Sequence, residues 1–429
     1  MTAPRLSPTD FSFLAYEAAH GTVAAEIGAL LQFDGSAPDV EELRTHVASR
    51  LALLPGLCWR LDRGRSRWRR PRWVECDAVN MRVHIRARRV GRGSGLAGLR
   101  AAIGEVLSHP LDQAAPPWQM WLVTGYADGE FTIVYKVHHA LHDGVALADV
   151  VQSLFSRRWA ARPGNVASAP APSWVRRVAR VLRGLASLTL DFARLAPRSP
   201  VNRPHSGRRT LVWCTAPTAR LEAARSVVGS TLNDVYLAAL ADALHTVMAG
   251  TGERFPERLC ALVPVSIRQP AERGSLGNRL AAVRVALPTT AGSAVHKLAA
   301  VTHATRRAKR HGQALAAAMV ASAGRALPAI LARGIAELTF NPRLVNLIAS
   351  GIPGPKNALD LAGRALTAFY AINFAPADHG VSVTLMSYRD HVFVSFAGDA
   401  ELPALAALPG HWLAALDRLQ PKAGVTASA

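Results

Sequence analysis

Two adjacent histidines followed by an aspartate and a glycine are the residues of this sequence best suited to chemistry. His138 and His139 precede Asp143 and Gly144 in the pattern HHxxxDG. An imidazole has an unperturbed pKa of about 6.5. Near neutral pH it can therefore take a proton from an alcohol and return it to a leaving group. This chemistry favours His139 as a general base in an acyl transfer.

Two other interpretations of these histidines stay open. The His and Asp side chains could bind a metal ion, although adjacent residues of a strand point in opposite directions, which argues against it. They could also be structural histidines whose ring nitrogens form hydrogen bonds within the protein, which is the usual case for a lone histidine. The doublet with Asp-Gly at a strand end favours catalysis. The sequence has no GxSxG nucleophile motif, so direct transfer fits better than a covalent acyl-enzyme.

The HHxxxDG segment lies at a predicted junction of a strand and a helix. The run Phe131 to Tyr135, rich in β-branched and aromatic residues, predicts a buried strand, and the alanine- and valine-rich segment from Val145 predicts a helix. Such junctions often carry functional residues. Asp143 can turn back to brace the loop or pair with a distant arginine. Gly144 permits a backbone conformation that is closed to other residues.

The composition describes a chain large enough for two domains. Its 429 residues are 50% hydrophobic. The four cysteines have neither CxxC nor zinc-ligand spacing, and the N-terminus lacks a signal-peptide pattern. We therefore expect a reduced, cytoplasmic protein with free thiols and no bound metal. No uncharged apolar run of about 18 residues predicts a membrane-spanning helix.

The formal net charge of +20 predicts attraction to polyanions, such as nucleic acid, anionic lipid or a phosphorylated substrate. Zinc-finger, RNP and basic-zipper motifs are absent, so we expect no nucleic-acid partner. An arginine-biased genome explains part of the excess. Arginine and tryptophan interleave between Cys58 and Trp73. This stretch fits a polyanion or membrane-surface strip, or a basic hairpin of edge strands, which we favour.

We predict three segments: an N-terminal domain over residues 1–159 that carries HHxxxDG, a linker over 160–206, and a C-terminal domain over 207–429. Strands and helices alternate without strict βαβ units, which predicts an α/β fold with mixed sheets. Within the linker, Trp174 to Leu195 has an apolar face and arginines opposite it near its start. It fits a membrane-surface helix and a linker helix packed across both domains about equally.

Further short motifs are spread along the chain. They are Leu6–Asp10 (LSPxD), His109–Asp112 with Pro117-Trp118 (HPLD…PLW), Ser206–Arg209 (SGxRR), Asn233-Asp234-Val235 (NDV), Pro264–Arg268 with Gly277-Asn278 (PVSxR…GN) and Asn346–Pro355 (a strand with an SNxPGP turn). Together with HHxxxDG they resemble the bacterial wax ester synthase/diacylglycerol acyltransferase family. That family is a branch of the chloramphenicol-acetyltransferase-like, condensation-domain-like superfamily, which HxxxD alone would indicate. Two motifs depart from the family pattern, at Pro116-Pro117 and at Ser350-Gly351-Ile352.

The resemblance implies a fold and an activity. The fold is two chloramphenicol-acetyltransferase-like domains of mixed sheets flanked by helices, with an active-site tunnel at the domain interface. The activity is transfer of a fatty acyl group from acyl-coenzyme A to a long-chain alcohol or diacylglycerol. No cofactor is implied beyond acyl-coenzyme A as co-substrate. Peripheral contact with the inner membrane or with lipid inclusions would accompany such substrates.

The resemblance also implies roles for single residues. His139 would be the general base, His138 would shape the site, and Asp143 with Gly144 would hold the loop. The expected substrate-binding or oxyanion-supporting residues are Pro117, Trp118, Asn233, Asp234, Ser266, Arg268 and Asn278.

Charge adds two expectations to these roles. Because a buried carboxylate needs a cation or donors, we expect Arg268 to pair with Asp143. Arginines near the tunnel mouth would steer the phosphates of coenzyme A. His142, an additional histidine inside the motif, is expected to be solvated.

Two alternative functions accompany the leading one. The enzyme alternative is the same chemistry on a specialised metabolite or with a carrier-bound acyl donor. The non-enzymatic alternative is a lipid-surface interaction protein with a decayed site. The intact His-His-Asp-Gly argues against decay.

Overall fold

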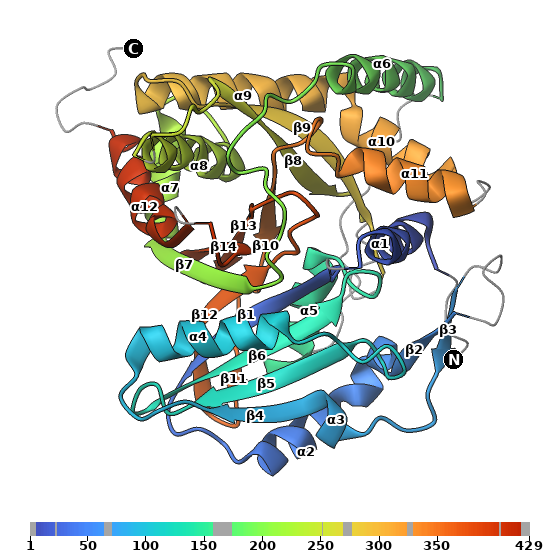
Figure 1. Cartoon of the computed structure of the whole chain (residues 1–429), viewed down its shortest axis with the longest axis vertical. Helices are drawn as coiled ribbons and strands as arrows, with labels where there is room; N and C mark the ends of the chain where they lie inside the picture. The colour runs from blue at the N-terminus through green and yellow to red at the C-terminus, as the bar shows by residue number, and fades with distance from the viewer. Residues whose placement is uncertain are drawn as a thin grey trace.

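Two six-stranded sheets organise the computed structural model of this protein, one in each half of the molecule (Figure 1). The structure describes residues 6–21, 24–63, 71–157, 174–250, 252–268, 277–323, 329–402 and 405–421. The strand orders are β11-β12-β1-β6-β5-β4 in the first sheet and β7-β14-β13-β10-β8-β9 in the second. Both sheets mix parallel and antiparallel pairs and are flanked by helices, which confirms the predicted α/β fold.

The first sheet carries the HHxxxDG segment at the end of a central strand. Its strands are β1 (Glu26–Asp34), β4 (Ile85–Arg89), β5 (Trp118–Thr124), β6 (Glu130–His138), β11 (Asp360–Leu361) and β12 (Arg364–Ile372). The accompanying helices are α2 (Val40–Arg50), α3 (Met81–His84), α4 (Gly95–Ser108) and α5 (Gly144–Phe155). β6 is buried along nearly its whole length, as its apolar run predicted.

A separate hairpin accounts for the arginine- and tryptophan-rich stretch. β2 (Trp59–Asp62) and β3 (Arg72–Glu75) pair antiparallel, with the ring of Trp73 buried. This confirms the hairpin interpretation for the described part of the stretch. Residues 64–70, which hold several of its arginines, lie outside the described residues.

The second sheet is surrounded by most of the remaining helices. Its strands are β7 (Arg209–Pro217), β8 (Arg258–Ser266), β9 (Leu280–Pro288), β10 (Leu347–Pro353), β13 (Val381–Tyr388) and β14 (His391–Asp399). The helices are α7 (Thr218–Ser226), α8 (Leu232–Ala249), α9 (Ala294–His311), α10 (Gln313–Ala323), α11 (Ala329–Thr339) and α12 (Leu408–Arg418). β10 continues to Pro353, so part of the predicted turn at Ser350 to Pro355 is strand.

One strand of the C-terminal half belongs to the N-terminal sheet. β12 pairs antiparallel with β1, with Phe369 opposite Leu31. Apolar and aromatic residues give β12 the content of a strand, yet the patterns above do not predict it. The sheets therefore divide the chain differently from the predicted segments 1–159 and 207–429, because β11 and β12 cross over. This crossing ties the two halves together.

Helix α1 (Pro8–Ala19) lies between the two halves, beside α11 (Figure 1). The side chain of Ser7 accepts from the Asp10 amide at 3.1 Å, and Asp10 Oδ2 accepts from the Ser7 amide at 2.7 Å. This capping box starts the helix. Phe13 of α1 then packs with Phe340 and Phe374 of the C-terminal half in an apolar cluster at the interface.

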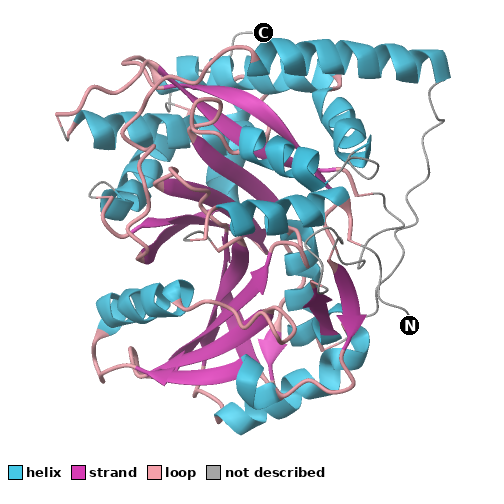
Figure 2. Ribbon diagram, turned by 45° about the vertical axis from the view of Figure 1, so that its right-hand side comes forward, coloured by secondary structure: helices cyan, strands magenta, loops and turns pink. Residues whose placement is uncertain are grey.

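Helix α6 (Trp174–Phe192) lies along α10 and α9 (Figures 1 and 2). A Cβ atom added at Gly184 would lie 2.7 Å from the carbonyl oxygen of Gly312, so the two backbones approach closely. The Gln313 amide donates to Ser187 Oγ at 2.8 Å and to Asp191 Oδ2 at 2.7 Å. The helix therefore packs mainly on the C-terminal half, rather than across both domains.

Candidate active site

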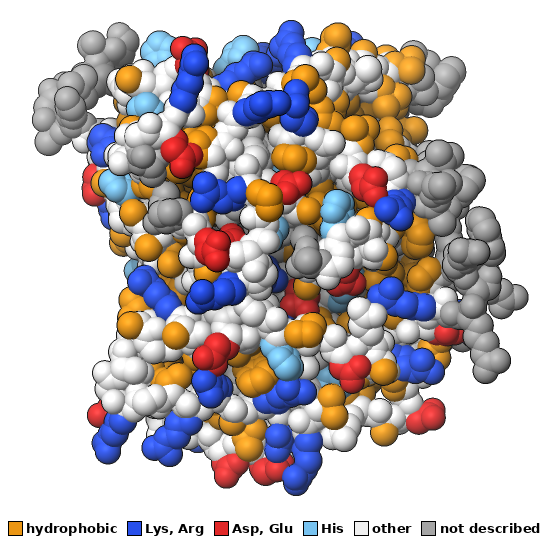
Figure 3. Space-filling model, in the orientation of Figure 1, with side chains coloured by type: hydrophobic (Ala, Val, Ile, Leu, Met, Phe, Trp, Pro, Cys, Tyr) orange, Lys and Arg blue, Asp and Glu red, His pale blue; other side chains and the backbone are white. Residues whose placement is uncertain are grey.

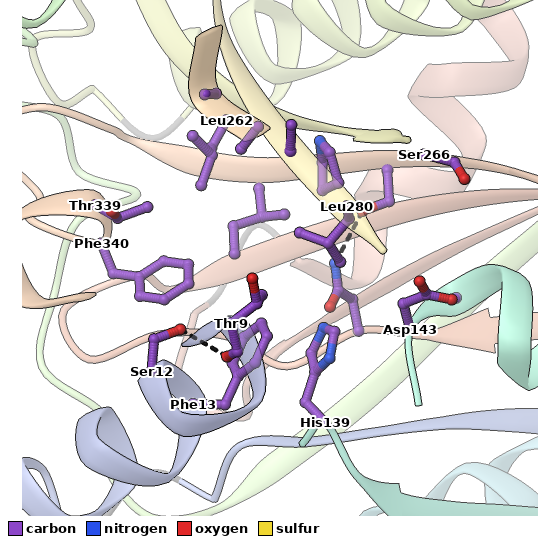
Figure 4. A pocket seen from close by; sticks show the side chains of 18 of the residues that line it. Thr9, Ser12, Phe13, His139, Asp143, Leu262, Ser266, Leu280, Thr339 and Phe340 are labelled. Carbon is purple, nitrogen blue, oxygen red and sulfur yellow. Dashed lines mark hydrogen bonds between the residues drawn. The ribbon is translucent and has the colours of Figure 1, made fainter. Parts of the chain in front are cut away.

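His139 follows the last residue of β6 and is held there by hydrogen bonds from its backbone to two other segments of the protein. Its amide donates to the carbonyl of Ala25 at 2.7 Å, and its carbonyl accepts from Asn278 Nδ2 at 2.6 Å. Its ring stacks on Phe13, with centroids 3.8 Å apart, and meets Phe374 edge-on at 5.6 Å. The ring is buried. These contacts fix the imidazole in one orientation (Figure 4).

The apolar surroundings keep the His139 ring neutral. Burial lowers the pKa of His139 to about 4, against the smaller raising effects of its own carbonyl and of Asp143. The Nδ1 atom is buried and makes no hydrogen bond to the described residues. A neutral imidazole with a free lone pair is the form that accepts a proton.

Asp143 holds the loop that follows His139. One carboxylate oxygen caps α5 by accepting from the Ala146 amide at 2.8 Å. The other accepts from Arg268 Nη2 at 2.9 Å and from the Arg279 amide at 2.8 Å. The expected pairing of Asp143 with Arg268 is confirmed, and both side chains are buried. Among the described residues no hydrogen bond joins Asp143 to the His139 ring.

The segment 277–279 docks onto the HHxxxDG loop from the C-terminal half. The Gly277 amide donates to the carbonyl of Leu141 at 3.0 Å. The Asn278 side chain donates both to the His139 carbonyl and, at 2.8 Å, to Asp10 Oδ1. Asn278 therefore joins α1, the HHxxxDG loop and the C-terminal half at one point. It acts on the backbone of His139, and its Oδ1 atom is buried without a hydrogen-bond partner among the described residues.

A cavity of about 730 Å³ opens beside the His139 ring. Its volume lies in the range of small-ligand sites, roughly 300–1,000 Å³. Its walls are mainly apolar and come from α1, β8, β9, β10 and helices α6, α10 and α11 (Figure 4). The polar side chains that line it include Ser266, Ser350, Asn373 and Thr384. Among the described residues that line it, His139 is the one basic side chain. The cavity lies where the two halves meet.

His138 points away from this cavity. Its Nδ1 accepts from the Ala140 amide at 3.0 Å, so its Nε2 carries the proton and donates to Glu17 Oε2 at 3.2 Å. His138 lines a smaller neighbouring cavity together with Glu17. The two histidines therefore serve opposite faces of the strand, as expected of adjacent strand residues.

Four of the other predicted site residues lie away from the cavity. Trp118 is buried in the core of the N-terminal half, where its indole donates to the Leu57 carbonyl at 2.8 Å, and the Pro117 carbonyl accepts from the His138 amide. Asp234 forms a capping box with Thr231. Asn233 lies against Gly351, a residue of the cavity wall. These positions fit support of the site rather than direct contact with a substrate.

Two expectations about the loop are wrong in detail. His142 is fully buried, not solvated: its ring bonds to Tyr135 Oη at 3.1 Å and to the Leu141 carbonyl at 2.9 Å. Gly144 does not have the positive φ angle that glycine alone favours. It is needed for space instead, because a Cβ atom there would lie 2.5 Å from the Ile352 side chain.

The sequence patterns above did not single out every residue around His139. Phe13 and Phe374 flank the ring but stand in ordinary apolar runs, with no motif of their own. Asp10 and Asn278 were part of recognised motifs, yet their contact across 268 residues of chain was not predictable. As for metals, the described residues contain no group of three or more His, Cys, Asp or Glu side chains arranged to hold one.

Comparison with known proteins assigns the family. The profile of the wax ester synthase/diacylglycerol acyltransferase catalytic domain matches residues 6–187, and that of the WS/DGAT C-terminal domain matches residues 276–420. This chain belongs to the wax ester synthase/diacylglycerol acyltransferase (WS/DGAT) family. It is therefore an acyltransferase of the WS/DGAT kind, as the resemblance of its motifs implied, and not the non-enzymatic alternative.

Relatives of known name support this assignment along most of the WS/DGAT chain. A Mycobacterium tuberculosis protein named as a diacylglycerol O-acyltransferase is 28% identical over 393 residues, 84% of this chain and 83% of that protein. A second Mycobacterium tuberculosis protein, also named as a diacylglycerol O-acyltransferase, is 26% identical over 425 residues, which cover 93% of this chain and 92% of that protein.

Solved structures agree with the fold of this WS/DGAT protein. The wax ester synthase/diacylglycerol acyltransferase from Marinobacter aquaeolei VT8 matches with a TM-score of 0.70 and 25% identity, covering 97% of this chain and 98% of that one. The first condensation domain of the calcium-dependent antibiotic synthetase matches with a TM-score of 0.67 at 17% identity, covering 98% and 96%. The second likeness concerns the fold alone.

Proposed function

We propose that this protein transfers a fatty acyl group from acyl-coenzyme A to the hydroxyl of a long-chain alcohol or diacylglycerol. The observation that carries the proposal is the neutral His139 ring in the wall of an apolar cavity of about 730 Å³. Burying a long alkyl chain in such a cavity stabilises the complex by about 0.8 kcal/mol for each buried CH₂ group. The names of the relatives agree with these substrate classes.

The proposed mechanism uses one base and no covalent acyl-enzyme. A ring nitrogen of His139 takes the proton of the acceptor hydroxyl as its oxygen attacks the thioester carbonyl carbon. The tetrahedral intermediate then loses the coenzyme A sulfur, and the imidazolium returns the proton to this thiolate. No cofactor is required beyond acyl-coenzyme A as co-substrate.

The residues around His139 have supporting roles in this proposal. Asp143 and Arg268 keep the loop after β6 in place, and Asn278 holds the His139 carbonyl. Gly144 lets Ile352 approach, and Ser266 lines the cavity. We place His138, Pro117, Trp118, Asn233 and Asp234 behind the walls of the site, where they position it.

The test is consumption of palmitoyl-coenzyme A by the purified protein with hexadecanol or diacylglycerol. We expect turnover in the wild type and its loss, by at least about 100-fold, in His139→Ala, because general-base catalysis contributes roughly 10²–10⁴-fold. His303→Ala, an exposed histidine of α9, is the matched control and should keep full activity. Equal turnover in wild type and His139→Ala would show that His139 is not the general base. Turnover only with a specialised alcohol or a carrier-bound donor would favour the enzyme alternative.

We also propose that the protein contacts a membrane or lipid inclusion peripherally. None of the described helices is long and apolar enough to cross a bilayer. Four exposed apolar residues form what we name the apolar rim: Leu182, Val320, Ile335 and Leu338. The last three also line the cavity, so the rim adjoins it. Hydrophobic side chains gather at the upper right of Figure 3, where Figure 1 places α6 and α10.

A further inference from the structure

A second cavity, of about 420 Å³, lies behind the strands that carry the site. Neighbouring residues of the same segments line one cavity or the other: Ile27 and Phe374 line the first, while Glu26 and Ala375 line the second. The smaller cavity at His138 adjoins this second one, sharing Glu17 and Arg63 with it. The polar space therefore reaches the back of the His138-His139 pair.

The acidic groups of this second cavity already have partners in the protein. Glu26 Oε2 lies 3.0 Å from Lys136 Nζ, and its Oε1 accepts from the Leu111 amide at 3.1 Å. Asp399 accepts from the Ser206 amide at 2.6 Å and from its hydroxyl at 2.9 Å. Glu17 accepts from His138. Their charges and lone pairs are therefore largely satisfied.

The arginines of the same cavity are not satisfied in this way. The guanidinium of Arg208 is exposed and makes no hydrogen bond or ion pair with the described residues. Arg209 makes one long hydrogen bond, from Nη2 to the Asn373 carbonyl at 3.4 Å, and burial lowers its pKa. Arg63 forms a long ion pair with Glu17, at 3.9 Å. The guanidinium of Arg209 is buried near the charge of Glu26 with one long hydrogen bond, and that of Arg208 is open to solvent, so both are available to an anion.

We propose that this second cavity binds the phosphate groups of coenzyme A, with Arg208 and Arg209 as the ligands. Guanidinium groups bind phosphate oxygens in a planar, two-point geometry that suits this group well. The inference rests on the proposed function, because the apolar cavity suits alkyl chains and leaves the charged part of the donor to be housed elsewhere. It also gives the Ser206–Arg209 motif a role. Free phosphate and the head group of an anionic lipid share the same chemistry.

Calorimetric titration of free coenzyme A tests the site without requiring turnover. Arg208→Ala should weaken the affinity at least about tenfold, because a charge-assisted contact to phosphate is lost from an exposed side chain whose removal does not disturb folding. Arg92→Ala removes the same charge from an exposed arginine far from the cavity and should bind as the wild type does. Pantetheine, which lacks the phosphates, should bind equally to all three proteins.

Competitors and a truncated donor separate the remaining outcomes. Inorganic phosphate should displace coenzyme A from the wild type, and the KM for palmitoyl-coenzyme A, but not for S-palmitoyl-N-acetylcysteamine, should rise in Arg208→Ala. Equal affinity of wild type and Arg208→Ala for coenzyme A overturns the site. So does an Arg208 effect confined to phosphatidic-acid vesicles. If the protein transfers acyl groups but its affinity for coenzyme A does not depend on Arg208, the proposed function stands and the phosphate site is wrong. If binding of coenzyme A depends on Arg208 but no alcohol is acylated, the phosphate site stands and the proposed function is wrong.

Discussion

His139 is a neutral imidazole in an apolar wall, and this state is the one that a general base requires. Its ring touches Phe13 and Phe374 and has no carboxylate partner in the part of the chain that the structure describes. Asp143, which stands in the same motif, is committed to Arg268 and to the cap of α5. The aspartate therefore acts on the position of the loop, while the basicity of His139 is set by burial.

The burial of His139 predicts the pH at which kcat/KM for acyl transfer falls on the acid side. Because burial lowers the pKa of His139 to about 4, the base stays unprotonated well below the ordinary histidine value of about 6.5. We expect kcat/KM for acyl transfer to stay level as the pH falls to about 5 and to decrease as it falls through about 4. Initial rates across this range check the expectation. An acid limb centred near 6.5 would show that the ring is solvated.

The buried ion pair at the loop makes a second prediction at this scale. Arg268→Met would leave the Asp143 carboxylate buried without a cation, and we expect the free energy of unfolding in urea to fall by about 3–5 kcal/mol. Arg72→Met, which breaks the exposed Arg72–Asp62 pair, should cost less than about 1 kcal/mol. Similar losses in both variants would mean that the burial of Asp143 is not the cause.

At the scale of elements, α1 and α6 shape the site from outside the sheets. α1 brings Phe13 to His139 and Asp10 to Asn278, so a helix near the N-terminus completes the surroundings of a residue on β6. α6 places Leu185, Leu188 and other apolar side chains in the cavity wall. Its apolar face is thus partly used within the molecule, and only part of it faces solvent.

The close contact of α6 with α10 makes a prediction for a single glycine. A Cβ atom at Gly184 would lie 2.7 Å from the Gly312 carbonyl oxygen and 2.8 Å from Ala316 Cβ. Gly184→Ala should therefore lower the melting temperature, although alanine favours helix by about 1 kcal/mol. Gly334→Ala is the control, because nothing lies within 4 Å of a Cβ atom there, and it should leave the melting temperature equal or higher. Stabilisation by both changes would contradict the packing described for α6.

At the scale of the whole molecule, the site belongs to both halves at once. β12 completes the N-terminal sheet, and segment 277–279 is bonded to the HHxxxDG loop. The apolar cavity opens among α6, α10 and α11, whereas the polar cavity lies on the other side of β1 and β6. In the proposed function, lipid chains and charged groups would therefore reach the His138-His139 pair from different sides.

The apolar rim predicts how the molecule meets a lipid surface. Leu338→Ser removes an exposed leucine of the rim and should reduce co-flotation with anionic vesicles several-fold, because each buried leucine contributes about 1.5–3 kcal/mol. Leu53→Ser is the matched control, since Leu53 is 53% exposed and Leu338 56%, but Leu53 lies in the N-terminal half. Equal loss of flotation in both variants, or none in either, would remove the rim as the contact surface.

The sequence by itself determined the features that depend on neighbouring residues. The strand-to-helix junction at His139 and the mixed α/β class follow from local periodicity. The motifs were specific enough to indicate the family, and the charge of a buried carboxylate was enough to single out Arg268 as the partner of Asp143.

Only the tertiary structure decided which surface each residue serves. Strand alternation places His138 and His139 on opposite faces, but the packing of α1, β8 and α11 determines which face becomes the apolar cavity. The pairing of β12 with β1 and the contact of Asn278 with Asp10 join segments hundreds of residues apart. Such contacts depend on the burial and hydrogen bonding of the complete fold, which local patterns of sequence do not encode.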